Sequence, residues 1–464
     1  MKGENKVIDQ EKPIMKNKTY TLDIVSLGHS GEGVGKYKGF TIFVPHALPG
    51  ETVEVKIIEV KKSYAKGNLQ AILKPAGARS EPKCPIYYEC GGCQLQHVSY
   101  DEQLILKRQN VVDAITRIGK LTDIQIHPTI GAKDSWYYRN KMQVPIGTVK
   151  GKIVVGCFAQ GTHTIINTEH CFIQHKANNT VAQTVQQIIT ELGISTYDEV
   201  TGQGIMRHVL GRVGTVTDDV MVVLVTATHE LPHQERIIVE LRQRIPNLVS
   251  IVQNINSKRT NVVLGNQTKT LWGQNMITDK LGEFTFHISA RSFFQVNTKQ
   301  AEVLYNKAVE YAGLSGQETV IDAYCGTGTI TLFLARQAKK VYGIEIVEPA
   351  IRDAQHNAQM NQISNVEFIV GDAVDVMPQM FKQGIRPQII VVDPPRAGCD
   401  KEVLETFAAM LPERIVYVSC NPSSLARDLA VLEEYGYKTK EIQPVDMFSH
   451  TYHVEVVCKL VKIT

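Results

Sequence analysis

The segment ETVIDAYCGTGTITLFLARQ, residues 318–337, decides the fold. An apolar strand, ETVIDAY, runs into a glycine-rich turn, and the pattern of TITLFLARQ predicts a helix directly after it. Further apolar strands follow, separated by helical patterns: KVYGIEIV, VEFIVGDA, PQIIVVDPP, RIVYVSC and the closing HVEVVCKLVKI. This alternation predicts a doubly wound α/β domain, Rossmann-like and with a parallel sheet, over residues 286–464.

Two further domains are predicted before it. After a polar leader, residues 1–18, the stretch 19–78 contains four or five short β-branched strands between turn segments. Such strands predict a small barrel of the OB-fold type, an architecture often used to bind oligonucleotides. Residues 79–285 mix helical and strand patterns, with one helix expected over 100–118, so a central α+β domain is expected.

Composition excludes several classes of protein. The 464 residues include 50 Lys and Arg against 47 Asp and Glu, and 43% are hydrophobic, which excludes a disordered chain. No run reaches the roughly 18 apolar residues of a membrane span, and the charged N-terminus lacks a secretion signal's apolar core. We therefore expect a cytoplasmic protein. Residues 1–80 hold 13 basic and 8 acidic residues, a net +5, which favours contact with a polyanion.

Polar residues at the predicted strand ends indicate the cofactor. Asp322 opens the pattern D-x-x-x-G-x-G, and Glu345 ends the next strand, where an acid can bind both hydroxyls of a ribose. Asp372 ends the third strand, where a polar side chain can meet an adenine amine. The spacing differs from the G-x-G-x-x-G of a pyrophosphate binder. The pattern therefore favours S-adenosylmethionine (SAM) over a dinucleotide.

The next two strand ends carry candidate catalytic groups. The fourth strand ends at Asp393-Pro-Pro-Arg396, and the fifth ends at Cys420. Carbon 5 of a pyrimidine is too weak a nucleophile to take a methyl group directly, but thiolate addition at carbon 6 makes it an enolate carbon that can. A base must then remove the proton from carbon 5. Glu455, at the start of the last strand, is the candidate base and Cys420 the candidate nucleophile.

Nine cysteines in a cytoplasmic chain favour metal binding or catalysis over disulfides. Cys84, Cys90 and Cys93 have the spacing C-x5-C-x2-C, and a fourth thiolate is available from Cys157 or Cys171. Zinc and a [4Fe–4S] cluster are both chemically possible. The spacing differs from the C-x3-C-x2-C of radical-SAM enzymes, which argues against radical methylation.

Five motifs in order resemble those of the RumA/TrmA family of RNA (uracil-5-)-methyltransferases: ARSFFQVN at 290–297, DAYCGTGT, DPPRAG, VSCNPSSLARD and HTYHVE. The resemblance covers nearly the whole chain. It implies an N-terminal OB-like TRAM domain and a class I SAM-dependent methyltransferase domain. It also implies Cys420 as nucleophile, Glu455 as base, and an aromatic, Phe293, beside the target base.

The resemblance further implies which residues bind the cofactors. SAM contacts are expected from Gln295, Tyr324, Glu345, Asp393, Thr329 and Asp372. RumA-type members carry a [4Fe–4S] cluster with the same cysteine spacing, and their fourth cysteine aligns with Cys171. The expected cluster ligands are therefore Cys84, Cys90, Cys93 and Cys171, with Cys157 structural by default.

Two basic stretches of the central region are candidates for RNA contact. Arg139 and Lys141 follow two tyrosines, and Arg207 precedes a histidine. Side chains of these kinds can hold a splayed RNA loop by stacking and phosphate contacts. The predicted function is SAM-dependent methylation of uridine at C5 in 23S rRNA, with no membrane and no obligate protein partner. The alternatives are a tRNA uridine C5-methyltransferase and a noncatalytic iron–sulfur RNA-binding protein.

Overall fold

A computed structural model describes residues 13–463. Most of the predicted polar leader, residues 1–12, lies outside the described residues. The chain forms two compact units. Of the described residues, the N-terminal unit holds 13–83, Cys93–Leu106 and His450–Tyr452, and the larger unit holds Cys84–Gly92, Lys107–Ser449 and 453–463.

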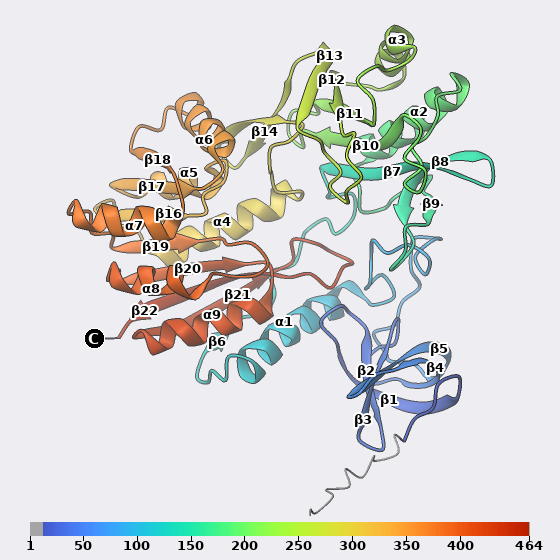
Figure 1. Ribbon diagram of the computed structural model, residues 1–464. Coiled ribbons are helices and arrows are strands. Elements are labelled where there is room, and N and C mark those ends of the chain that lie inside the picture. Colours follow the sequence, from blue (N-terminus) through green and yellow to red (C-terminus); the bar gives the residue numbers. More distant parts are fainter. Residues whose placement is uncertain (1–12, 464) are drawn as a thin grey trace, which may run out of the picture. The chain divides into compact units, whose positions relative to one another are not determined.

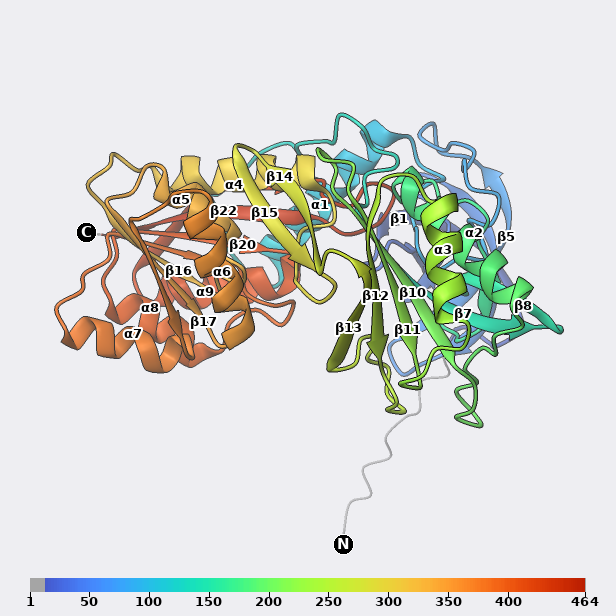
Figure 2. The ribbon, with the colours of Figure 1, turned by 90° about the horizontal axis from the view of Figure 1, so that it is seen from above.

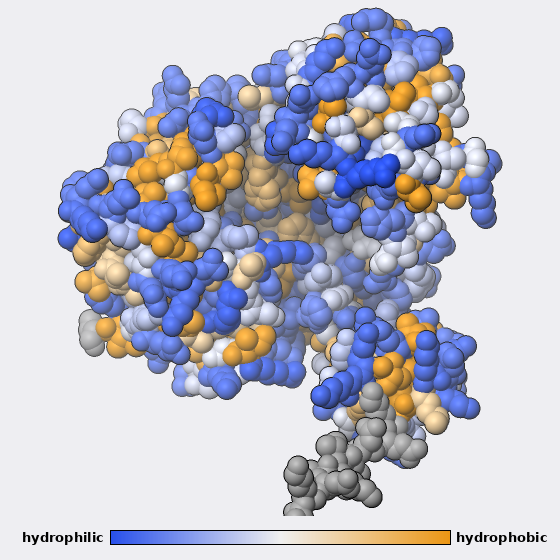
Figure 3. Space-filling model, in the orientation of Figure 1, coloured by the Kyte–Doolittle hydropathy of each residue, from blue (hydrophilic) through white to orange (hydrophobic). Residues whose placement is uncertain are grey.

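The N-terminal unit contains the predicted barrel. Its strands are β1 (Thr19–Leu27), β2 (Gly33–Tyr37), β3 (Phe40–Val44), β4 (Thr52–Val60) and β5 (Tyr64–Lys74) (Figure 1). They close in the order β1-β2-β3-β5-β4, which confirms the barrel. Alternate residues such as Leu22, Ile24, Val53 and Val55 fill its interior because successive side chains of a strand face opposite sides. In Figure 3, hydrophilic residues flank the barrel's hydrophobic ones on the visible face.

The larger unit contains the predicted α/β domain. Its elements are α4 (Thr298–Ala312), β16 (Thr319–Ala323), α5 (Thr329–Ala335), β17 (Lys340–Glu345), α6 (Glu348–Met360), β18 (Val366–Val370), α7 (Ala373–Lys382), β19 (Ile389–Val392), α8 (Lys401–Ala409), β20 (Arg414–Ser419), α9 (Pro422–Glu434), β21 (Tyr437–Val445) and β22 (Glu455–Lys462). The sheet order is β18-β17-β16-β19-β20-β22-β21-β6. The strands from β16 to β20 pair in parallel and β22 is antiparallel, so the carboxyl ends of the parallel strands share one edge.

Helices cover both faces of this sheet. Side chains of α4, α5 and α6 share one core with Val320, Val391 and Val416. Side chains of α7, α8 and α9 share the other core with their strand neighbours Ile321 and Ile390. Helix α1 (Tyr100–Arg117), predicted over 100–118, contributes Val111 and Ala114 to this second core, and β6 (Gln125–Ile126) pairs with β21. Both elements fall within the predicted central domain, whose boundaries stay predictions.

A second sheet occupies the middle of the chain. It comprises β7 (Lys141–Val149), β8 (Lys152–Phe158), β9 (Ile165–Asn167), β10 (Met206–Val213), β11 (Val220–Thr226), β12 (Leu248–Ile255) and β13 (Gln267–Gly273), in the order β13-β12-β11-β10-β7-β8-β9. Helices α2 (Lys176–Glu191) and α3 (Gln234–Arg244) pack on one face (Figure 2). The hairpin of β14 (Met276–Leu281) and β15 (Phe284–Ser289) shares a core with the other face. Over the described residues, no helix is long and apolar enough to cross a bilayer.

Candidate active site

The glycine-rich loop after β16 has the backbone conformation that a close-fitting turn requires. Gly326 and Gly328 have φ of 55° and 79°, and Tyr324 has φ of 65°, a left-handed conformation that is uncommon for a non-glycine residue. Held strain of this kind is concentrated at functional sites. Glu345 lies against the loop, since its Oε2 accepts a hydrogen bond from the Gly326 amide at 3.2 Å. The predicted pair of cofactor residues Tyr324 and Glu345 therefore meets at one loop.

A fully buried tyrosine of α4 joins several predicted residues. Tyr305 hydrogen-bonds Thr329 at 3.3 Å, and it also hydrogen-bonds the side chain of Gln295. Burial, and after it the charges of Asp393 and Glu455, raise the pKa of Tyr305, so its hydroxyl stays protonated.

Asp372 stands at the start of α7, where its Oδ1 caps the helix by accepting from the Val374 amide at 3.1 Å.

The candidate nucleophile and base lie in one electrostatic neighbourhood. Burial, and then the Asp393 charge, raise the pKa of Glu455 to about 8. Burial raises the pKa of Asp393 to about 6. Burial and the charges of Glu455 and Asp393 raise the pKa of Cys420 to about 11, whereas Arg396 lowers it through its charge and a hydrogen bond to the sulfur. The three groups and one cation are thus brought together at the ends of β19, β20 and β22.

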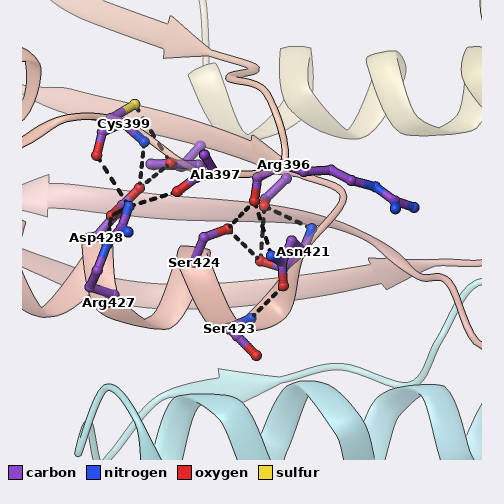
Figure 4. Close-up of polar contacts among 10 residues, drawn as sticks. Arg396, Ala397, Cys399, Asn421, Ser423, Ser424, Arg427 and Asp428 are labelled. Atoms are coloured by element: carbon purple, nitrogen blue, oxygen red, sulfur yellow. Dashed lines mark hydrogen bonds and ion pairs between the residues drawn. The ribbon is translucent and has the colours of Figure 1, made fainter. Parts of the chain in front are cut away.

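Hydrogen bonds from side chains to a backbone carbonyl join the loop that carries Arg396 to the segment that follows Cys420. The Arg396 carbonyl accepts from Asn421 Nδ2 at 3.0 Å and from Ser424 Oγ at 3.1 Å, at the start of α9. Figure 4 shows this carbonyl turned toward Asn421 and Ser424 while the Arg396 guanidinium extends away from them. The Arg396 Nη2 lies 3.0 Å from His453 Nδ1, two residues before Glu455. The guanidinium thus bridges the DPPR loop and the start of β22.

The loop that connects β21 to β22 is anchored by a buried ion pair. Lys107 Nζ of α1 binds the Asp446 carboxylate and donates to the Phe448 carbonyl at 3.0 Å. Both side chains of the pair are almost fully buried. Ser449 Oγ donates to Asp446 Oδ2 at 2.7 Å, so the same carboxylate also holds the next part of the loop. Sequence reasoning missed this pair because its members are 339 positions apart.

The loop 290–297 presents an aromatic side chain and is held by Asn140, just before β7, and by Arg212 of β10. Phe293 is 71% exposed. Asn140 Nδ2 donates to the Gln295 carbonyl at 2.9 Å, and Arg212 donates to the Ser292 carbonyl. Asn297 caps α4 by accepting from the Gln300 amide. Phe293 therefore stands on a loop whose backbone is fixed.

Two of the predicted RNA-contacting cations form a group with a third. Burial, and then the charges of Arg212 and Arg139, lower the pKa of Lys141 to about 8. Arg212 is 3% exposed, and its Nε has no hydrogen-bond partner among the described residues. Arg207 lies elsewhere on β10: its Nη1 donates to the Asn256 and Lys258 carbonyls, and its guanidinium stacks 4.3 Å from the Tyr197 ring centroid. Sequence reasoning picked out Arg207 on β10 but missed Arg212, because only the pairing of β10 with β7 places Arg212 opposite Lys141.

Three of the four predicted cluster cysteines interact with one another. Cys84 is affected electrostatically by Cys171 and Cys90, and burial raises its pKa. Cys157, which was expected to be structural, shares a hydrogen bond with Cys90. Cys93 belongs to the N-terminal unit. Within residues 13–463, no group of three or more His, Cys, Asp or Glu side chains is arranged to hold a metal ion, so the cluster stays a prediction.

The fold and the strand-end groups define a class I SAM-dependent methyltransferase domain that follows a TRAM barrel. The family model described as tRNA (Uracil-5-)-methyltransferase matches residues 100–463, and the TRAM domain model matches residues 13–69. The chain belongs to this family of RNA uracil-5-methyltransferases.

Relatives and a solved structure agree with this membership. The chain is 51% identical over 451 residues to an uncharacterised RNA methyltransferase of Halalkalibacterium halodurans, covering 97% of this chain and 98% of the relative. It is 52% identical to an uncharacterised RNA methyltransferase of Bacillus cereus, with the same coverage. The Pyrococcus abyssi tRNA (uracil-54, C5)-methyltransferase, solved with S-adenosyl-L-homocysteine, superposes with a TM-score of 0.77 at 29% identity, covering 95% of this chain and 100% of that one.

Proposed function

We propose that this protein methylates uridine at C5 in 23S rRNA through a covalent adduct between Cys420 and uracil C6. The observation that carries the proposal is the convergence of Cys420, Glu455, Asp393 and Arg396 at neighbouring strand ends. A single buried thiol or a single buried acid would not by itself indicate catalysis. A thiol beside a cation and a buried acid is the set that addition and proton removal require.

The steps balance with these groups. Cys420 first loses its proton to water, a loss that its raised pKa opposes and the Arg396 charge favours. The thiolate then adds to C6, and the electron pair of the C5–C6 double bond makes C5 nucleophilic. SAM, when bound, would supply the electrophilic methyl group that C5 takes, and its sulfur would keep the electron pair of the broken bond as a neutral thioether. The Glu455 carboxylate then removes the C5 proton, and the returning electron pair expels the Cys420 thiolate. The buried position of Glu455 raises its basicity, which suits it to this task near neutral pH.

For the cofactor, we assign Gln295, Tyr324, Thr329, Glu345, Asp372 and Asp393. Support comes from the left-handed Tyr324–Gly328 loop, from Glu345 beside it, and from the hydrogen bonds that join Gln295 and Thr329 to Tyr305. The Asp322 side chain is fully buried next to the loop. Its Oδ2 accepts a hydrogen bond from Thr331 Oγ1 at 2.5 Å. Asp322 therefore acts as a support for the loop.

The RNA substrate has two candidates. The C-x5-C-x2-C spacing and Cys171 favour 23S rRNA, through the resemblance to RumA-type members. A tRNA uridine is the second candidate, because the matching structure is named as a tRNA (uracil-54, C5)-methyltransferase. Mapping 5-methyluridine in 23S rRNA and in tRNA from a deletion strain separates them: loss from 23S rRNA alone supports the proposal, and loss from tRNA alone refutes it. A cytoplasmic location stays a prediction.

A [4Fe–4S] cluster on Cys84, Cys90, Cys93 and Cys171 is part of the proposal. Its support is the cysteine spacing, the resemblance, and the mutual influence of Cys84, Cys90 and Cys171. Anaerobically purified protein is expected to contain about four iron atoms per chain and to absorb broadly near 400 nm, as such clusters do (both values approximate). Stoichiometric zinc without iron would overturn the assignment.

Two substitutions test the chemistry. Cys420→Ala is expected to abolish methyl transfer while RNA binding persists, because the thiolate activates the base without being needed to dock it. Glu455→Gln is expected to accumulate a covalent protein–RNA adduct, visible as a denaturation-resistant gel shift. Cys458→Ala, which removes a buried sulfur three residues after Glu455, is the control and should keep activity. Near-normal turnover by Cys420→Ala would refute the nucleophile.

A further inference from the structure

The second sheet holds a cavity of about 340 Å³ that the proposed chemistry does not use. It is lined by Thr148 at the end of β7, Phe158 at the end of β8, Tyr197, and Arg207 and His208 at the start of β10. Its volume falls within the range of about 300–1,000 Å³ in which ligand pockets lie. We propose that this cavity binds an unstacked nucleobase of the substrate RNA, other than the uracil that is methylated. The inference rests on the proposed function.

Two residues that line the cavity each have a buried nitrogen without a hydrogen bond. Arg207 Nε and His208 Nδ1 are buried, and neither has a hydrogen-bond partner among the described residues. The Arg207 guanidinium is fixed, since its Nη1 donates to the Asn256 carbonyl at 2.6 Å and to the Lys258 carbonyl at 2.7 Å. Buried polar groups are ordinarily paired, so two unpaired nitrogens in residues that line a cavity are the groups that would bind the polar edge of a ligand once a small side-chain shift opens them to it.

Aromatic side chains supply the stacking surface. Phe158 and Tyr197 both line the cavity, and His163 packs against Phe158 with ring centroids 5.3 Å apart. RNA-binding proteins commonly stack unpaired bases on aromatic rings and arginine planes and read the base edges by hydrogen bonds. The cavity combines both elements: rings for the base faces, and the Arg207 and His208 nitrogens for an edge.

The charges around the cavity favour a neutral ring over a phosphate. Asp198 and Glu199 both line it, and hydrogen bonds from the Thr201 and Val200 amides lower the pKa of Asp198, so this carboxyl is ionised. Burial lowers the pKa of His208 to about 4, so its ring is neutral at physiological pH. Glu199 Oε2 lies 3.0 Å from His163 Nδ1, and Arg207 is the fixed cation, with its Nη1 already donating to two carbonyls. The acids that line the cavity would repel a phosphate group, whereas they would not repel a neutral base.

Strand β10 places the cavity within reach of the loop that presents Phe293. Arg207 and His208 begin the strand, and Arg212 near its other end donates to the Ser292 carbonyl. Five residues of a strand span roughly 17 Å, at about 3.3 Å per residue. At the roughly 3.4 Å spacing of stacked nucleotides, that length corresponds to about five nucleotides. A base in the cavity and a base beside Phe293 can therefore belong to one short RNA segment.

The test blocks the cavity without touching the catalytic groups. Thr148 is exposed at the cavity lining, and Thr148→Trp places an indole over it. Thr190→Trp puts the same side chain on an exposed position of α2 outside the cavity and serves as the matched control. His208→Phe keeps a ring of similar shape and removes the unpaired nitrogen. The probe is a transcript of the 23S rRNA or tRNA segment that the wild-type enzyme methylates.

Thr148→Trp is expected to raise the Kd for this transcript about 5- to 150-fold, the range for losing one stacked base, with kcat at saturating RNA unchanged. The slope of log Kd against log salt should stay the same, because no phosphate contact is lost. Photocrosslinking with 4-thiouridine transcripts should join the segment 145–149 or 158–165 to a nucleotide near the target. His208→Phe should weaken binding in the same direction, and Thr190→Trp should leave Kd within twofold of wild type.

The proposal is overturned if folded Thr148→Trp and His208→Phe both bind the transcript with wild-type Kd. It is also overturned if Thr148→Trp lowers the salt slope by about one, which would indicate a phosphate. If Thr148→Trp fails to fold, His208→Phe and the crosslink decide the matter alone. Failure of the proposed function has a different signature, since the wild-type enzyme would then form no 5-methyluridine in either RNA.

Discussion

Replacing the proposed base should stabilise the protein as it destroys activity. Glu455 is 5% exposed, and its pKa is about 8 in the folded chain against an ordinary 4.5. Because the folded-state pKa is the higher one, the folded protein holds this proton more tightly than the unfolded chain does. Its stabilising contribution is complete below pH 4.5 and is lost progressively as the pH rises to about 8. Glutamine cannot ionise, so Glu455→Gln escapes this loss.

The size of the effect follows from the shift. One pKa unit corresponds to about 1.4 kcal/mol, so the full penalty is about 5 kcal/mol. The gain in the free energy of unfolding for Glu455→Gln over wild type should be about 2 kcal/mol near pH ~6, about 3 kcal/mol near pH ~7, and about 5 kcal/mol above pH ~8. Below the ordinary pKa of a glutamic acid the two proteins should be equally stable.

Denaturant unfolding across this pH range, followed by a probe in the C-terminal domain, measures the difference. Glu441→Gln is the control in the neighbouring strand, because hydrogen bonds from His127 and Lys459 lower the pKa of Glu441 despite its burial. That variant should lose stability relative to wild type above the ordinary pKa of a glutamic acid. A gain for Glu455→Gln that does not vary with pH would refute the raised pKa of Glu455.

Three further predictions concern RNA binding and the fold. RNA affinity should fall as the pH rises through about 8, since Lys141 loses its charge there, and Lys141→Arg should flatten this dependence in a filter-binding titration. Lys107→Met should lower the free energy of unfolding by about 3–5 kcal/mol, because it leaves the Asp446 carboxylate buried without its partner; an unchanged denaturation midpoint would contradict this. Replacing the exposed lysines Lys36 and Lys62 of the barrel with glutamine should reduce the salt slope of RNA binding by about 0.7 for each one that contacts a phosphate of a single-stranded loop. An unchanged slope would leave the barrel without that role.

The strand-end residues were predictable from the sequence because topology places them. Once β16, β17, β19 and β20 are parallel neighbours, the residues that follow them must share one edge, and Glu345 and Cys420 do so. Tyr305 has no such signal: it lies on the buried face of α4, and only the tertiary structure brings its hydroxyl to Gln295 and Thr329. The position of such a residue depends on tertiary packing, and a sequence pattern holds no information about that packing.

The cysteines also show that a sequence pattern identifies neighbours along the chain but not distant residues that join them in the fold. The spacing C-x5-C-x2-C marks Cys84, Cys90 and Cys93 because local chain geometry brings close neighbours together. Spacing could not decide between the distant cysteines. The structure pairs Cys157 with Cys90, because the Gly91 amide donates to the Phe158 carbonyl and ties this loop to the end of β8. A long-range backbone contact thus brings in a thiol that the sequence pattern left aside.

The catalytic domain contains three buried acids with raised pKa values, and these acids should respond to the charge of the bound cofactor. Burial is the first cause for Asp322, Asp393 and Glu455, whose pKa values are about 7, about 6 and about 8, and the Asp393 charge adds to the other two. Ionised carboxylates in such a site favour a positive charge, and SAM carries one on its sulfur whereas the demethylated product does not. Glu455 should therefore give up its proton more readily with SAM present than with the product. Its basicity then rises once the methyl group has left, which in the proposed mechanism is the stage at which Glu455 removes the C5 proton.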